Sequence, residues 1–135
     1  MATAPQFVTT PNAGTPQTIT AANTATDGTG TVALIFTAGA SGSLLPSVRF
    51  THLGTNVATV ARVFYNNGSD PTVAGNNALI GEKAIAANTL SQTAESIVYD
   101  LSLNVVMAAS DRIYVTLGTA VAAGIKATPI NGGDY

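Results

Sequence analysis

Residues 26–50 read Thr26-Asp-Gly-Thr-Gly30, then Thr31-Val-Ala-Leu-Ile-Phe36, then Thr37-Ala-Gly-Ala-Ser-Gly-Ser43, then Leu44-Leu-Pro-Ser-Val-Arg-Phe50. Two of these segments are rich in β-branched and aromatic residues, and the segments before them are rich in Gly, Ser, Thr and Asp. A short apolar run between glycine-containing segments favours a strand, because a helix of ordinary length would have to include the glycines. The stretch therefore predicts a turn, a strand, a second turn and a second strand.

The same alternation of short apolar runs and turn residues continues to the C-terminus. The expected strands cover residues 18–20, 31–36, 44–52, 57–65, 79–85, 97–105, 113–117 and 125–130. The run 31–36 is apolar on both faces, which predicts a strand buried between two layers. About eight short strands at intervals of about a dozen residues predict an all-β fold, an antiparallel and jelly-roll-like β-sandwich.

The first 17 residues have a different composition from the rest. Pro5, Pro11 and Pro16 lie among threonines, and Phe7 and Val8 are the bulky apolar pair. Proline spacing of this kind favours an extended arm over a helix or a central strand. We therefore expect an arm over 1–17 and a sandwich domain over 18–135. The arm is either a disordered tail or a segment that orders on a partner, with Phe7 and Val8 as candidate interface residues.

Charged residues are scarce. They make up 9% of the 135 residues, whereas a soluble domain usually has about 25%. Thr, Ser, Asn, Ala and Gly must then cover most of the surface, and such a surface is desolvated at low cost when it meets a neighbour. This favours a subunit that is largely covered by other subunits.

The same composition excludes several classes of function. A net charge of −2 with five scattered basic residues argues against nucleic acid as a partner. No apolar run approaches the length of a membrane span, and the N-terminus has no recognisable export signal, so we expect synthesis in the cytoplasm and no membrane partner. Cysteine is absent, which excludes disulfides and thiolate chemistry.

No motif for catalysis or for metal binding stands out. His52 is the one side chain that titrates near neutrality without a shifted pKa, and a lone histidine on a strand is usually a packed or surface residue. The aspartates fall singly beside turns or strand ends, whereas a calcium loop places several oxygen ligands at regular spacing. The sequence therefore predicts a protein that is not an enzyme and has no catalytic residue, metal site or cofactor.

Arg49 and Arg62 each lie inside an otherwise apolar expected strand. Either arginine is a surface residue on a half-exposed sheet, or it forms an interface ion pair with Asp100, Glu82 or a carboxylate of a partner. Both are candidate interface residues, and the sequence leaves both interpretations open.

The layout of the chain resembles a known family. Asp27-Gly-Thr-Gly-Thr31, the apolar run to Phe36, Thr37-Ala-Gly39 with its Gly-Ser turn, Val48-Arg49-Phe50 and the C-terminal Gly132-Gly133-Asp134-Tyr135 are similar to small structural proteins of tailed bacteriophages. Several of these proteins are capsid decoration, or cement, proteins. The similarity runs from about Thr24 to the C-terminus and leaves out the arm.

The resemblance implies a structural virion protein on the outer surface of a bacteriophage capsid. There it would bridge subunits of the major capsid protein and stabilise the capsid, as a homo-oligomer, either a trimer or a dimer. Multivalent attachment of many copies needs no reaction chemistry. The alternative is a tail or head-fibre module, or an adhesin that binds a host receptor or glycan.

Overall fold

The computed structural model describes residues 6–135, which fold as two antiparallel β-sheets packed face to face. The described chain contains ten strands and one short 3-10 turn, and no α-helix. The strands are β1 Thr10–Pro11, β2 Gln17–Ile19, β3 Ala33–Thr37, β4 Ser43–His52, β5 Thr59–Asn66, β6 Asn77–Ile85, β7 Tyr99–Met107, β8 Arg112–Leu117, β9 Ile125–Ile130 and β10 Gly133–Asp134, and the 3-10 turn η1 is Ala74–Asn76. The predicted all-β antiparallel sandwich is confirmed.

The first sheet is centred on β4, and the second has the order β3-β8-β5-β6. Along one edge β4 pairs with β9 and then with β10, and along its other edge it pairs with β7. β2 adds to β9, and β1 adds to β10. The prediction of about eight strands was too low, because the two-residue strands β1 and β10 have no hydrophobic pattern that could have revealed them.

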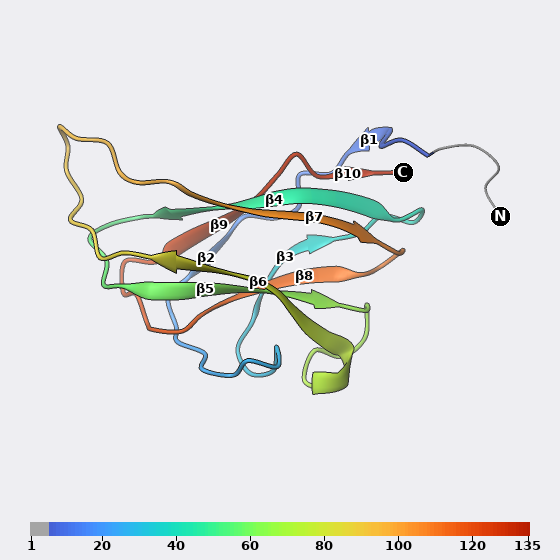
Figure 1. Cartoon of the computed structure of the whole chain (residues 1–135), viewed down its shortest axis with the longest axis horizontal. Coiled ribbons are helices and arrows are strands. Elements are labelled where there is room, and N and C mark those ends of the chain that lie inside the picture. The colour runs from blue at the N-terminus through green and yellow to red at the C-terminus, as the bar shows by residue number, and fades with distance from the viewer. Residues whose placement is uncertain (1–5) are drawn as a thin grey trace.

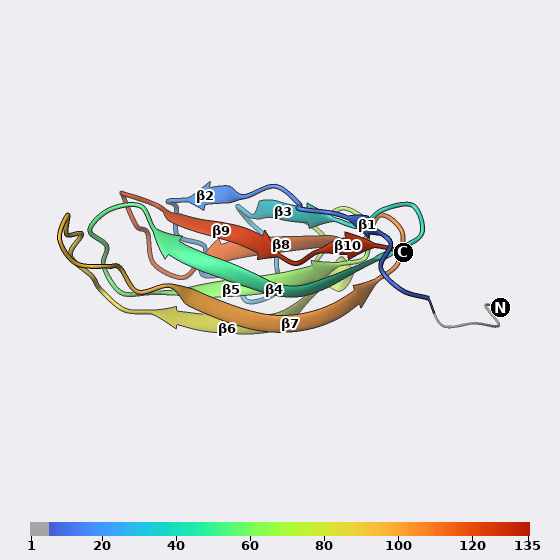
Figure 2. The same ribbon diagram turned by 90° about the horizontal axis from the view of Figure 1, so that it is seen from above.

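The core lies between the two layers, which Figure 2 shows stacked. The fully buried large side chains alternate along the central strands, as expected for strands with one face inward. They include Leu45, Val48 and Phe50 from β4, and Val63 and Val115 from β5 and β8. This alternation is the reason why the periodicity of the sequence located most strands correctly.

Pro46 lies inside β4, the most extensively paired strand, where a missing backbone N–H is normally costly. Pairing with β10 ends at Leu44, pairing with β9 begins at Ser47, and the register with β7 shifts between Leu45 and Ser47. Pro46 therefore lies at a position of β4 that is paired with no residue of a neighbouring strand. On β7 the irregularity includes Asn104, which has a φ of 49°, a conformation that asparagine tolerates better than most residues.

The prediction that residues 31–36 form a strand buried between two layers was wrong. β3 is an edge strand of the second sheet, and Leu34 on it is exposed. A register shift between Leu34 and Phe36 breaks the alternation, so that Ile35 and Phe36 are both buried. A bulge of this kind makes an edge strand look apolar on both faces.

The N-terminal segment, described from Gln6 onward, lies along the sandwich. β1 and β2 belong to it, and the amide of Thr15 donates to the carbonyl of Ile35 at 2.7 Å. The Asn12 side chain donates to Asp134 Oδ1 at 2.9 Å, and Ser43 Oγ donates to the same oxygen. We call these three side chains the terminal latch, because they join both ends of the chain to β4. Residues 1–5 of the expected arm lie outside the described residues.

Candidate interaction surface

The described segment just before β1 lies at the end of the molecule that also holds the C-terminus (Figure 1), and it contains Phe7 and Val8. Phe7 is 75% exposed and Val8 is 41% exposed. Val8 packs directly over Gly133, where a Cβ atom would collide with it. On the neighbouring strands the register aligns Pro11, Gly133, Leu44 and Val106 in one row, and Val106 is also exposed. We call this region, residues 7–8, Leu44, Val106 and 131–135, the terminus end.

The two arginines lie on different sheets, Arg49 on β4 and Arg62 on β5. Arg49 donates to both carboxylate oxygens of Asp100, at 2.8 and 3.1 Å, and both side chains are about half exposed. The pair holds the pKa of Asp100 below its usual value, chiefly through the hydrogen bond from Arg49. Arg49 is therefore a surface residue whose ion pair lies within the chain, which combines the two interpretations left open by the sequence.

Arg62 is on the second sheet, where its Nε donates to Glu82 Oε1 at 2.8 Å across β5 and β6. Its guanidinium also reaches the carbonyl of Asn23 at 3.4 Å, so this side chain is mostly covered by the connection between β2 and β3. Because the two arginines lie on different sheets, the four candidate residues named from the sequence do not form one surface.

His52 is buried at the end of β4, where its Nε2 lies 2.7 Å from the Asn88 side-chain nitrogen. Among the described residues its Nδ1 has no hydrogen-bond partner. Within residues 6–135 the ring is hydrogen-bonded to the side-chain amide of Asn88 and to no nucleophile or carboxylate, whereas acid–base catalysis uses such an orienting partner. The geometry instead makes His52 part of the packing between two loops.

Within residues 6–135 no group of three or more His, Asp or Glu side chains is placed to hold a metal ion. Asp27 and Asp70 each accept hydrogen bonds from a threonine two residues later, Thr29 and Thr72, which lowers the pKa of both carboxyls. These aspartates stabilise turns. In the same described region, no helix is long and apolar enough to cross a membrane.

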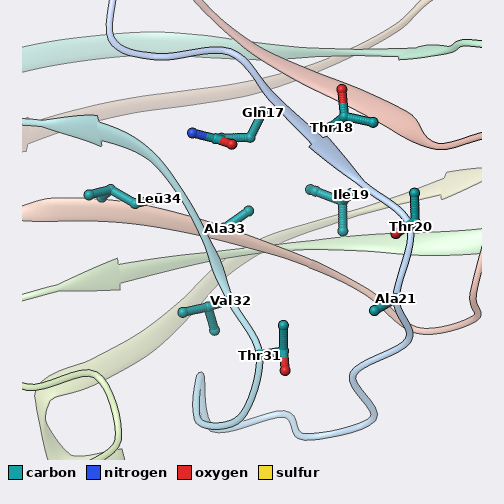
Figure 3. Close-up of a pocket in the computed structure, with 9 residues that line it drawn as sticks. All are labelled: Gln17, Thr18, Ile19, Thr20, Ala21, Thr31, Val32, Ala33 and Leu34. Atoms are coloured by element: carbon teal, nitrogen blue, oxygen red, sulfur yellow. The ribbon is translucent and has the colours of Figure 1, made fainter.

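An open groove of about 300 Å³ lies between the edge strands β2 and β3 (Figure 3). Its lining runs over residues 17–21 and 31–34 and contains no charged side chain. Ligand pockets of this size usually bring together a few polar groups that orient the ligand. The lining of this groove offers threonines, alanines and Gln17 and contains no titratable group.

The structure brings together a surface that the sequence reading did not predict. Three connections meet at the end of the sandwich opposite β1 and the C-terminus, and the longest of them, 86–98, projects beyond the strands (Figure 1). We call residues 53–58, 86–98 and 119–124 the loop end. Five of its apolar side chains are between 42% and 55% exposed, whereas Val121 is buried. The five exposed side chains are Leu53, Val57, Leu90, Ile97 and Val98.

The loop end carries almost no charge, since Glu95 is the one charged residue among the three segments. Sequence reasoning assigned Val57, Ile97 and Val98 to strands and the segment before Ile97 to a polar connection. In the structure β5 begins at Thr59 and β7 at Tyr99, which leaves these apolar side chains in loops. The sequence did contain a signal for these apolar loops, because the expected strands 57–65 and 97–105 each begin with an apolar residue, Val57 and Ile97.

The loops of the loop end are held together by hydrogen bonds. Asn56 and Asn88 exchange two backbone hydrogen bonds, at 2.9 and 3.1 Å. The buried Asn56 side chain donates to the carbonyls of Val57 and Ala86, and the amide of Leu90 donates to Thr55 Oγ1 at 3.2 Å. The apolar side chains are thus presented by loops that are already ordered, so less conformational entropy is lost when they bind.

Comparison of this chain with models of protein families, with curated proteins and with solved structures found no significant match.

Proposed function

We propose that this chain is a structural virion protein that decorates the outer surface of a bacteriophage capsid and stabilises it by bridging subunits of the major capsid protein. The observation that carries the proposal is the presence of exposed apolar side chains at both ends of a charge-poor sandwich. A bridging subunit needs two separate contact surfaces, one of which can meet a neighbouring copy instead of the capsid, and the terminus end and the loop end lie at opposite ends of the molecule (Figure 1).

Strand order supports a jelly-roll fold for this protein. Without the short strands β1 and β10, the two sheets have the orders β2-β9-β4-β7 and β3-β8-β5-β6. Two four-stranded antiparallel sheets, each combining strands from both halves of the chain, are the arrangement of a double Greek key, which occurs in capsid and lectin domains. The fold alone does not choose between these functions, and the low charge favours a role in assembly.

The energetics also fit a multivalent structural role. Full burial of a Val, Leu or Ile side chain is worth about 1.5–3 kcal/mol, so five half-exposed side chains provide about 4–7 kcal/mol. Association costs at least about 4 kcal/mol in lost freedom of motion. A single copy would therefore bind weakly through one end, and a stable attachment requires both ends or many copies.

The decisive experiment is to measure the copy number and position of the chain in purified particles of the phage whose genome encodes it. Quantitative mass spectrometry and cryo-electron microscopy should show hundreds of copies spread over the head. A few copies at the tail or at a vertex would support the alternative, a fibre or adhesin module. No copies in the particle would overturn both.

A variant lacking residues 2–8 tests whether the terminus end contributes to binding on the capsid. The deletion removes Phe7 and Val8 but keeps Thr9, Asn12 and Thr15, whose hydrogen bonds hold the segment on the sandwich. We expect an unchanged circular dichroism spectrum and lower occupancy on particles. Full occupancy by this variant would exclude the terminus end from the capsid contact.

A further inference from the structure

We propose that the loop end binds the loop end of a second copy of this chain, so that two molecules associate end to end with their terminus ends pointing away from each other. This contact can be tested on the purified protein without any particle. The role on the capsid can therefore fail while this contact stands, and the reverse also holds.

Charge favours a second copy as the occupant. In a two-fold contact each residue meets the same surface of its partner, so a strongly charged patch would be placed against itself. The loop end has one charged residue, Glu95, among its three segments. With a single charge among these three segments, a contact between two loop ends brings almost no like charge together.

The size of the loop end also favours a second copy as its partner. The three segments of the loop end supply about 25 residues, which lies in the range of 20–30 residues that a standard interface uses on each side. Exposed apolar side chains come from two of the three loops, and the third contributes exposed alanines at 120, 122 and 123. Small side chains there allow the larger ones of a second copy to approach closely.

The hydrogen bonds of the loop end support a preformed contact. The ladder between Asn56 and Asn88 fixes the base of the 86–98 connection, and Ala86 N donates to the Tyr99 hydroxyl at 3.1 Å. Ser91 Oγ accepts hydrogen bonds from the amides of Thr93 and Ala94, at 3.1 and 3.2 Å, and shapes the tip. A protruding segment that is ordered in the free chain and remains apolar is characteristic of a binding surface.

Sedimentation velocity of the full chain, from about 1 μM to about 1 mM, measures the association in the range in which weak dimers form. We expect a concentration-dependent dimer. Ile97→Asp and Val57→Asp should weaken dimerisation at least tenfold, because a buried unpaired carboxylate is costly at an interface. Val106→Asp is the matched control: it places the same charge on an exposed valine of the terminus end and should leave dimerisation unchanged.

Because the chain has no cysteine, single cysteine variants give a second measurement of the contact, one that does not require the dimer to be weakened. Under mild oxidation Val98→Cys should form a covalent dimer, and Val106→Cys should remain largely monomeric. A wild-type chain that is monomeric throughout the concentration range would overturn the proposal. So would dimerisation that survives both loop-end substitutions, or cross-linking that is as efficient at position 106 as at position 98.

Discussion

Replacing Asp134 with alanine should loosen the N-terminal segment and destabilise the whole domain. The carboxylate accepts hydrogen bonds from Ser43 Oγ and from Asn12 Nδ2, and Ser43 Oγ in turn accepts one from the amide of Gly39 at 2.9 Å. Ser43 is fully buried. Without Asp134 its hydroxyl group has no acceptor in the latch, and Asn12 loses the contact that ties it to the C-terminus.

The expected loss follows from the two hydrogen bonds. Hydrogen bonds to charged groups contribute about 1.5–3 kcal/mol each. Because Asp134 is only partly buried, we take the lower end of that range, which gives about 3 kcal/mol for the pair. For a domain of this size one kcal/mol shifts the Tm by about 3–5 °C, so Asp134→Ala should lower the Tm by about 10 °C.

Thermal unfolding followed by circular dichroism measures this shift, and hydrogen exchange reports on the segment itself. The amides of Thr9, Asn12 and Thr15, which donate to carbonyls of the sandwich, should exchange faster in the variant. Asp70→Ala is the control, because Asp70 is exposed and its carboxylate accepts hydrogen bonds only from Thr72 within its own turn. That change should leave the Tm close to the wild-type value.

The same variant has a defined pH dependence. The hydrogen bonds from Ser43 and Asn12 lower the pKa of Asp134 from its ordinary value of 3.8. A carboxyl whose pKa is lower in the folded state contributes stability above its unfolded value and loses it as the pH falls through the folded value. The difference between wild type and Asp134→Ala should be full at pH 7 and shrink well below pH 3.8. An unchanged Tm at pH 7, or a difference that stays constant in acid, would refute the latch.

Three further changes test other parts of the fold. The Tyr65 hydroxyl donates to Asp111 Oδ2 at 2.6 Å, and this bond and burial raise the pKa of Tyr65 to about 12. The stability that Tyr65 contributes is complete below the unfolded pKa of about 10 and is lost as the pH rises toward the folded value. Tyr65→Phe should therefore lower the free energy of unfolding by about 1 kcal/mol at pH 7. The variant should also lack the ultraviolet absorbance change that this phenol gives when it ionises at high pH. Asn104→Val should cost about 1–2 kcal/mol in denaturant unfolding, because a β-branched residue is strained at positive φ, whereas Asn104→Gly should cost nothing. Asn56→Ala should cost about 1–3 kcal/mol and speed amide exchange at Asn88, with unchanged exchange in β8 as the check that the rest of the fold is intact.

Much of the secondary structure follows from the sequence. β9 was predicted at its observed bounds, 125–130, because Gly124 precedes it and β-branched residues favour a strand over a helix there. β7 was predicted to begin two residues too early, at Ile97 in place of Tyr99. Both residues fit the alternating pattern, and only pairing with β4, which starts at Tyr99 opposite Phe50, determines where the ladder ends.

The candidate surface was much less predictable. Phe7 and Val8 stood out because the surrounding arm is polar, and the structure does leave them exposed. The loop end did not stand out, because Leu53, Leu90 and Ile97 are distant in sequence and each is ordinary in its own segment. Their proximity depends on the Asn56 to Asn88 ladder, which no local pattern reveals.

The sequence by itself determined the class of fold, since period-two alternation between turn residues leaves no other way to bury the apolar side chains, and it determined the low charge that any surface of this protein must have. Tertiary structure alone decided which strands pair. Arg49 meets Asp100, 51 residues away, and Asp134 meets Ser43, 91 residues away. Such contacts depend on the path of the chain between the two sheets, and the strand signals are too similar to one another to specify that path. For the same reason, only the folded chain shows that its apolar loops gather at the end opposite β1 and the C-terminus.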